Sequence, residues 1–232
     1  MTNAQLQIKI KERLNKLASL DYDNIECWQI VEAFNKAQLE WVRRQIGGYN
    51  QKQTGDGSSK INYDDTQKLI TTVPLTGISY GDNWTSLPHP ADYMNYSSLY
   101  GMGKNHCCPE RNIIIYIVDK SDLYVILRDA NKKPSFEWGE TVAVMTDDTF
   151  VIYTGGEFEM TSVDLTYYRK PRPVKFQNCI DISSGLPTGD VPCEFKDDIA
   201  EILVDNAVAT LAADIESFNQ YTRANTSVQN NT

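Results

Sequence analysis

The sequence predicts an α+β protein: a helical bundle, made of two N-terminal helices plus a long C-terminal helix, with an inserted antiparallel β-sandwich. Apolar residues recur at helical spacing before residue 48 and again between residues 195 and 218. Between these regions, short runs rich in β-branched residues and tyrosine alternate with turn residues, as is typical of antiparallel strands. A chain of 232 residues is long enough to bury one large or two small cores.

Two helices are expected at the N-terminus. The second begins after Asp23, which with Glu26 fits a capping box, and it stops at Gly47-Gly48. The apolar arc of this second helix is wide, so that more than one neighbouring element is needed to cover it. The first helix carries a single stripe of Leu6, Ile10, Leu14 and Leu17, whereas the second has two adjacent sets: Trp28, Val31, Leu39, Val42 and Ile46, then Ile30, Phe34, Ala37 and Trp41.

A polar linker rich in Gly, Ser and Gln is expected to lead from the helices to the strands. Turn residues at Asp119 to Asp122, Asp147-Asp148 and Gly155-Gly156 favour hairpin connections, and hence an antiparallel sandwich. The strands are expected at residues 68–73, 93–100, 112–118, 123–127, 141–145, 149–153 and 158–168.

The last helix carries two apolar faces, and two interpretations follow. Either its own domain encloses the helix, or one face packs on that domain and the other on a second subunit. One face has Phe195, Ile199, Ile202, Leu203, Ala209 and Ala213. The other face, combined with two tryptophans of the second helix, forms the predicted subunit interface: Trp28, Trp41, Val204, Val208, Leu211, Ile215 and Phe218.

These elements predict the organisation of the chain. The segments are N-terminal helices at 1–48, a linker at 49–67, the β-sandwich at 68–176, a proline-rich connector with the C-terminal helix at 177–220, and a polar tail at 221–232.

Composition excludes several classes of function. A net charge of −9 argues against a surface that grips nucleic-acid phosphates. No apolar run approaches the roughly 20 residues that span a bilayer, and the N-terminus lacks a signal-peptide pattern, so we expect a chain folded in a cytoplasm. The five cysteines follow no framework spacing, which favours reduced thiols.

The sequence predicts no catalytic, cofactor or metal site, and therefore no enzyme. The soft-ligand candidates are His89, His106, Cys107 and Cys108. Zinc would require the two adjacent cysteines to share one tetrahedron, unlike the spaced pairs of structural sites. An enzyme that uses the His89, His106 and Cys107 loops would lack an oriented base.

Two surface features remain open. The basic residues Arg169, Lys170 and Arg172 are candidates for contact with a partner, either DNA or an acidic protein. An aromatic platform for sugars is the alternative function, in which the β-sandwich is a receptor- or glycan-binding tail module. Its candidate residues are Trp84, Tyr93, Tyr96, Tyr100 and Trp138.

Four segments resemble one protein family. They are residues 17–48, the stretch PSFEWGETVAV at 134–144, VDLTYYRKPRPVKF at 163–176, and the segment 193–221 that contains the last helix. The chain resembles bacteriophage head–tail connector and tail tubular ring proteins, particularly those of crAss-like phages.

The resemblance implies a structural protein of the virion, located in the neck or tail and made in the bacterial cytoplasm. Members of this family form closed homo-oligomeric rings, commonly dodecamers, that dock on the portal or on neighbouring tail rings. DNA passes through the lumen during ejection without specific binding, and neither a membrane nor a cofactor takes part. The acidic composition agrees with a lumen that does not retain DNA.

Overall fold

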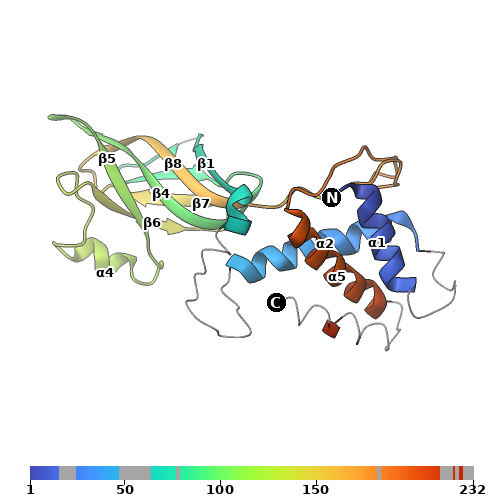
Figure 1. Cartoon of the computed structure of the whole chain (residues 1–232). Coiled ribbons are helices and arrows are strands. Elements are labelled where there is room, and N and C mark those ends of the chain that lie inside the picture. Colours follow the sequence, from blue (N-terminus) through green and yellow to red (C-terminus); the bar gives the residue numbers. More distant parts are fainter. Residues whose placement is uncertain are drawn as a thin grey trace. The chain divides into compact units, whose positions relative to one another are not determined.

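The computed structural model of the chain describes residues 1–15, 25–46, 64–76, 79–181, 184–214, 222 and 225–226. It divides into two compact units (Figure 1), which we call the helical unit (residues 1–68 and 171–232) and the sheet unit (residues 69–170). The sequence prediction placed the inserted domain at 68–176, whereas residues 171–176 contact the helical unit. Residues 49–63 of the expected linker, and most of the expected tail, lie outside the described residues.

The helical unit contains α1 (Asn3–Asn15), α2 (Cys27–Ile46) and α5 (Asp197–Asp214), and α5 contacts both other helices. Helix α1 buries Leu6, Ile10 and Leu14, which confirms the predicted stripe as far as Leu14, while Leu17 lies outside the described residues. Polar contacts also hold α1 to α5. Lys9 pairs with Glu201, and Arg13 pairs with both Glu201 and Asp205. None of the described helices combines the length and apolar content needed to cross a bilayer.

Helix α5 is buried by its own unit over a single wide face. At about 100° per residue, the buried side chains cover one continuous arc of the helix surface, with Ile199 at one edge and Ala212 at the other. Ala209 is only half-buried and Ala213 is exposed, although the sequence placed them on a core stripe. The buried set is Ile199, Ala200, Leu203, Val204, Ala207, Val208, Leu211 and Ala212.

Helix α2 buries one of its two predicted apolar sets in full and the other only in part, through Val42. Ile30, Phe34, Ala37 and Trp41 are at most 5% exposed. Trp28 and Leu39, from the other set, are 37% and 38% exposed. The helical unit therefore leaves part of the wide apolar arc of α2 uncovered.

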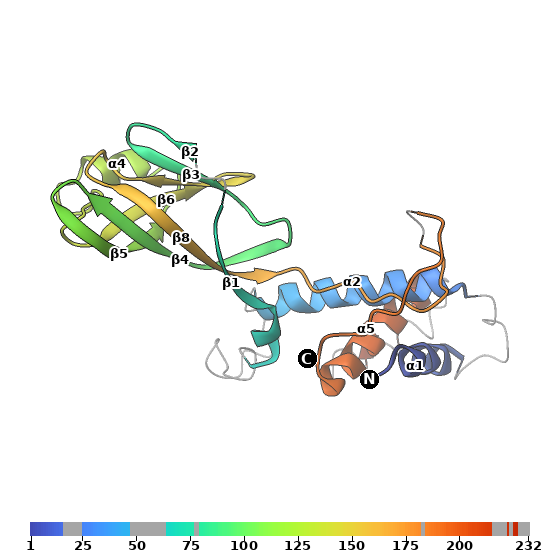
Figure 2. The same ribbon diagram turned by 90° about the horizontal axis from the view of Figure 1, so that it is seen from above.

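A return segment, described at residues 171–181 and 184–196, leads into α5 and runs along α2 (Figure 2). The Asn35 side chain donates to the carbonyl of Val174 at 3.1 Å and accepts from its amide at 2.8 Å. A disulfide joins Cys27 at the start of α2 to Cys179. The expectation of reduced thiols is wrong for this pair, because the fold brings together two cysteines that lie 152 residues apart in sequence.

The sheet unit is built on one eight-stranded sheet with the order β1-β8-β4-β5-β6-β7-β3-β2. Its strands are β1 (Ile70–Pro74), β2 (Ser79–Tyr80), β3 (Trp84–Pro88), β4 (Tyr93–Asn105), β5 (Cys108–Ile117), β6 (Glu140–Met145), β7 (Thr149–Tyr153) and β8 (Glu159–Arg169). Six of the seven predicted strands are confirmed, as β1 and β4 to β8. The sequence prediction missed β2 and β3.

The predicted fold class is wrong. A single curled mixed sheet replaces the antiparallel sandwich, and the described residues hold few helices. The last helix begins at Asp197 and not at Phe195, while residues 215–218 of the helix expected at 195–218 lie outside the described residues. Local turn residues predicted antiparallel pairs throughout, yet β5 and β6 are parallel. A parallel pair requires a crossover that hairpin signals cannot reveal.

The crossover contains helix α4 (Leu123–Arg128), where the sequence predicted a strand at 123–127. Asp122 occupies its N-cap position, and Leu123 packs with Val142 and Val144 of β6. Helix α4 lies beside the sheet in Figure 1. The β-branched run was misassigned because contacts with β6, rather than strand propensity, decide its conformation.

The curl lets one sheet enclose its own core. Inner-face residues of β3 to β8 form one buried cluster, which includes Leu87, Ile113, Phe150 and Tyr167. At Gly101 in β4, a Cβ atom would collide with the carbonyl of Ser162 in β8. Glycine therefore permits the close approach of these two strands.

We predict that Val208→Asp unfolds the helical unit, because Val208 is 5% exposed and an unpaired carboxylate there costs several kcal/mol. Urea unfolding followed by far-UV circular dichroism measures the loss. Ala213→Asp is the control, since Ala213 is exposed on the same helix and should change stability by less than about 0.5 kcal/mol. Equal stability of the two variants would contradict the assigned core.

Candidate functional site

An apolar groove of about 640 Å³ lies along one flank of α2 in the helical unit. The exposed set of α2 forms one wall, and the return segment forms the other. Polar groups lie among the lining residues, where Lys175 pairs with Asp181 at 3.4 Å. The apolar lining residues are Trp28, Val31, Leu39, Pro173, Val174 and Ile180.

The two walls of the groove are fastened to each other. The Asn35–Val174 hydrogen bonds and the Cys27–Cys179 disulfide hold the return segment beside α2. Asn3 of α1 also holds the return segment, because its side chain donates hydrogen bonds to the carbonyls of Lys175 and Val191 at 3.0 Å. The groove is therefore a built feature of the unit.

The predicted subunit-interface residues do not share one location. Trp28 lines the groove, whereas Trp41 is buried with its ring edge-on to Phe195 at a centroid distance of 5.2 Å. The stripe Val204, Val208 and Leu211 is buried in the core, so these side chains are not free to meet a second subunit. This placement corrects their assignment. Ile215 and Phe218 lie outside the described residues.

A second apolar position lies on α1. Ile8 is 65% exposed, and it lies two residues from both Leu6 and Ile10, which places it about 160° around the helix from each of them. Sequence reasoning missed both Ile8 and Ile180, since isolated apolar residues among polar ones carry no periodic signal.

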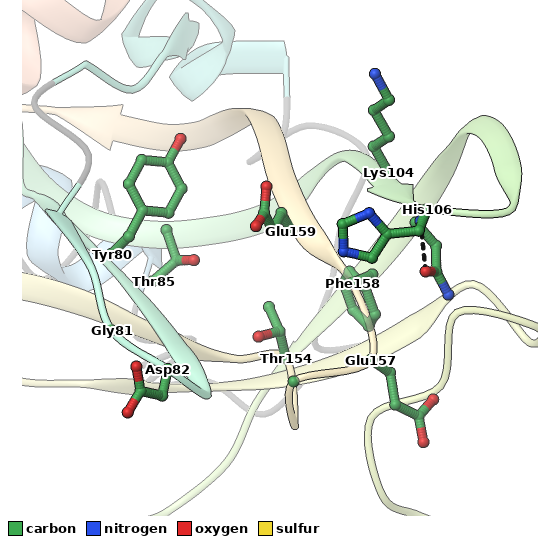
Figure 3. Close-up of a pocket in the computed structure, with 12 residues that line it drawn as sticks. Tyr80, Gly81, Asp82, Thr85, Lys104, His106, Thr154, Glu157, Phe158 and Glu159 are labelled. Carbon is green, nitrogen blue, oxygen red and sulfur yellow. Dashed lines mark hydrogen bonds between the residues drawn. The ribbon is translucent and has the colours of Figure 1, made fainter.

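The sheet unit contains a separate polar cleft of about 880 Å³ (Figure 3). Thr85, Thr154 and Phe158 are buried among its lining residues, while Tyr80 is 60% exposed. The exposed side chains around it are Tyr80, Asp82, Lys104, His106, Glu157 and Glu159. The carboxylates, hydroxyls and aromatic ring, which lie beside Lys104 and His106, offer the hydrogen-bonding and stacking groups that a polyhydroxylated ligand needs.

The cleft is shaped by loops between strands that are distant in sequence. The amide of Thr154, after β7, donates to the carbonyl of Asn83, before β3, at 2.9 Å. The Tyr80 hydroxyl donates to the carbonyl of Met160 at 3.3 Å, and Glu157 pairs with Lys133 at 3.2 Å. The sequence prediction missed this site because it missed β2 and β3, although the Gly81-Asp82-Asn83 turn was a signal for that hairpin.

The five aromatic residues predicted as a sugar platform are divided among different environments. Tyr93 and Tyr96 pack against the sheet core. Tyr100, Trp84 and Trp138 are 44%, 39% and 81% exposed, but none of them lines the polar cleft.

The basic candidates are exposed or half-exposed. Arg169 ends β8 and is half-buried, while Lys170 and Arg172 are exposed. The backbone amide of Arg172 donates to a carboxylate oxygen of Glu194 at 2.9 Å. Their role as partner contacts stays a prediction.

The soft-ligand candidates are also separated. His106, Cys107 and Cys108 lie at the exposed turn between β4 and β5, whereas His89 follows β3 and stacks on Tyr93. Within the described part of the chain, no group of three His, Cys, Asp or Glu side chains could hold a metal ion.

Comparison with known proteins finds no family model and no curated protein that matches the chain. The resemblance to phage ring proteins therefore stays an expectation from the sequence.

His89 should make folding sensitive to pH. Burial lowers the pKa of His89 below 6.5, against the opposing charges of Asp148 and Asp147, and its Nε2 atom is buried with no hydrogen-bond partner within the described structure. The unfolded chain then binds a proton more readily than the folded one, so stability is lost as the pH falls below about 6.5.

Urea unfolding between about pH 7.5 and pH 5 tests this dependence. His89→Phe should show a smaller loss of stability on acidification than the wild type. His106→Asn replaces the other of the two histidines, which is exposed, and should keep the wild-type pH dependence. An unchanged pH dependence in His89→Phe would contradict the assigned role of burial.

Proposed function

We propose that this chain is a structural subunit of a bacteriophage virion that assembles into a closed ring in the neck or tail. Neighbouring copies meet through the helical unit, the ring docks on the portal or adjacent tail rings, and DNA passes through its lumen. The observation that carries the proposal is the apolar α2 groove, whose residues Trp28, Leu39 and Ile180 are 37%, 38% and 60% exposed.

The occupant of the groove is a second copy of this chain. A closed ring joins two different surfaces of each subunit, because its interfaces are heterologous. The helical unit offers two such surfaces, the groove beside α2 and the side of α1 that carries Ile8. An apolar groove of this kind, left uncovered on a monomer, marks an interaction site.

The electrostatics agree with passage of DNA. A net charge of −9 disfavours retention of phosphates, which is the property a conduit needs. The exposed Lys170 and Arg172 are candidates for contact with an acidic neighbouring protein.

Leu39→Asp should disassemble the ring, because it places a charge in the groove without disturbing the buried face of α2. Native mass spectrometry of the purified chain measures the particle mass. We expect the wild type as a closed oligomer and the variant at the subunit mass, with a dissociation constant raised by more than about tenfold.

Val125→Asp is the matched control, since Val125 is 71% exposed on α4 in the sheet unit. It should leave the ring mass unchanged. A wild-type chain that stays monomeric, or a Leu39→Asp variant with the wild-type mass, would rule out the groove as the ring contact.

The polar cleft supports a second candidate, in which the sheet unit binds a glycan. The specific observation is that the exposed Tyr80 ring and the Asp82 and Glu159 carboxylates line the same cleft (Figure 3). Sugars bind through hydrogen bonds of this kind combined with contact on an aromatic face.

A glycan array probed with the full chain tests this candidate. Glu159→Gln should weaken any binding by about tenfold or more, because it removes a charged hydrogen-bond acceptor. Glu137→Gln, at an exposed position that does not line the cleft, should bind like the wild type. Absence of binding to every glycan would count against this candidate and leave the ring proposal unaffected.

A further inference from the structure

The turn between β4 and β5 presents two adjacent thiols. The strands pair as far as Asn105 opposite Cys108, so that His106 and Cys107 form the two-residue turn. Cys107 and Cys108 are both exposed, and their Sγ atoms are 2.9 Å apart. Two sulfurs held this close are positioned to react with each other.

The other cysteines do not compete for this chemistry. Cys27 and Cys179 are joined to each other. Cys193 is half-buried, and its burial raises its pKa, which disfavours the reactive thiolate. All five cysteines lie in the described part of the chain. Of these, Cys107 and Cys108 are the two that are both free and exposed.

We propose that Cys107 and Cys108 form a redox-modification site, at which a low-molecular-weight disulfide of the glutathione class converts the two thiols into a reversible vicinal disulfide. The site is independent of ring assembly, because it belongs to the sheet unit and not to the groove.

The reaction has two exchange steps. The Cys107 thiolate attacks one sulfur of oxidised glutathione, forms a mixed disulfide and releases the first glutathione thiolate. Cys108 then gives its proton to solvent and attacks the Cys107 sulfur, which forms the intramolecular bond and releases the second glutathione thiolate. The two protein thiols lose two electrons, and the glutathione disulfide gains them.

The surroundings favour this order of attack. The hydrogen bond between the sulfurs raises the pKa of Cys108, so this residue keeps its proton while Cys107 attacks and loses it to solvent only in the second step. After the first step, the Cys108 sulfur is already beside the mixed disulfide. Closure within the chain is then faster than attack by a second glutathione, because the reacting atoms are held together.

Closure should also alter the polar cleft. The covalent ring that the disulfide closes includes the peptide between Cys107 and Cys108, at the last pair of the β4–β5 ladder. Lys104, Asn105 and His106 precede this peptide directly and line the cleft. In the oxidised state, the disulfide therefore restrains the backbone at one rim of that cleft.

The test treats the full chain with oxidised glutathione and follows it by intact mass spectrometry and maleimide labelling. The three free thiols should fall to one, Cys193, with a mass loss of two hydrogens and with peptide mapping that places the bond between Cys107 and Cys108. A reducing thiol should restore labelling.

Two variants sharpen the result. Cys193→Ser should form the same bond, whereas Cys107→Ser should show no loss of two hydrogens. A wild-type chain that keeps both thiols reactive, holds a stable glutathione adduct or links to a second chain under the same conditions would overturn the proposal.

Discussion

The attachment of the return segment to α2 is the constraint on which the helical unit depends. The chain leaves this unit at Lys68 and re-enters it at Pro171, so that α5 can join the core only if the segment before it is held in place. The Asn35–Val174 hydrogen bonds and the Cys27–Cys179 disulfide provide that hold. They also leave one flank of α2 uncovered, and that flank is the groove to which we assign ring contacts.

The sheet unit solves a different packing problem. A sandwich hides its apolar faces between two sheets, whereas here one sheet curls until its own inner face is covered. Gly101 allows β4 to approach β8 closely, and the α4 crossover makes the parallel β5–β6 pair possible. Residues from strands far apart in the sheet order line one polar cleft: Tyr80 in β2, Glu159 in β8 and Thr154 after β7.

Features determined by local pattern could be predicted from the sequence. The stripe of Leu6, Ile10 and Leu14 and six strands are found where periodicity placed them. Long-range pairing could not be predicted in this way. The α4 helix, the Cys27–Cys179 bond and the burial of Val208 depend on partners far away in sequence. In the groove, the apolar residues of α2 could be recognised from the sequence. The opposite wall with Ile180 could not, and neither could the polar cleft of the sheet unit.

The proposed assembly explains why α2 keeps an exposed apolar set while α5 is enclosed by its own unit. An electron cryomicroscopy reconstruction of the particle formed by the purified chain tests this account most directly. We predict a closed ring in which a neighbouring subunit fills the groove against Trp28, Leu39 and Ile180. A monomeric particle, or a ring in which these three side chains face solvent, would contradict it.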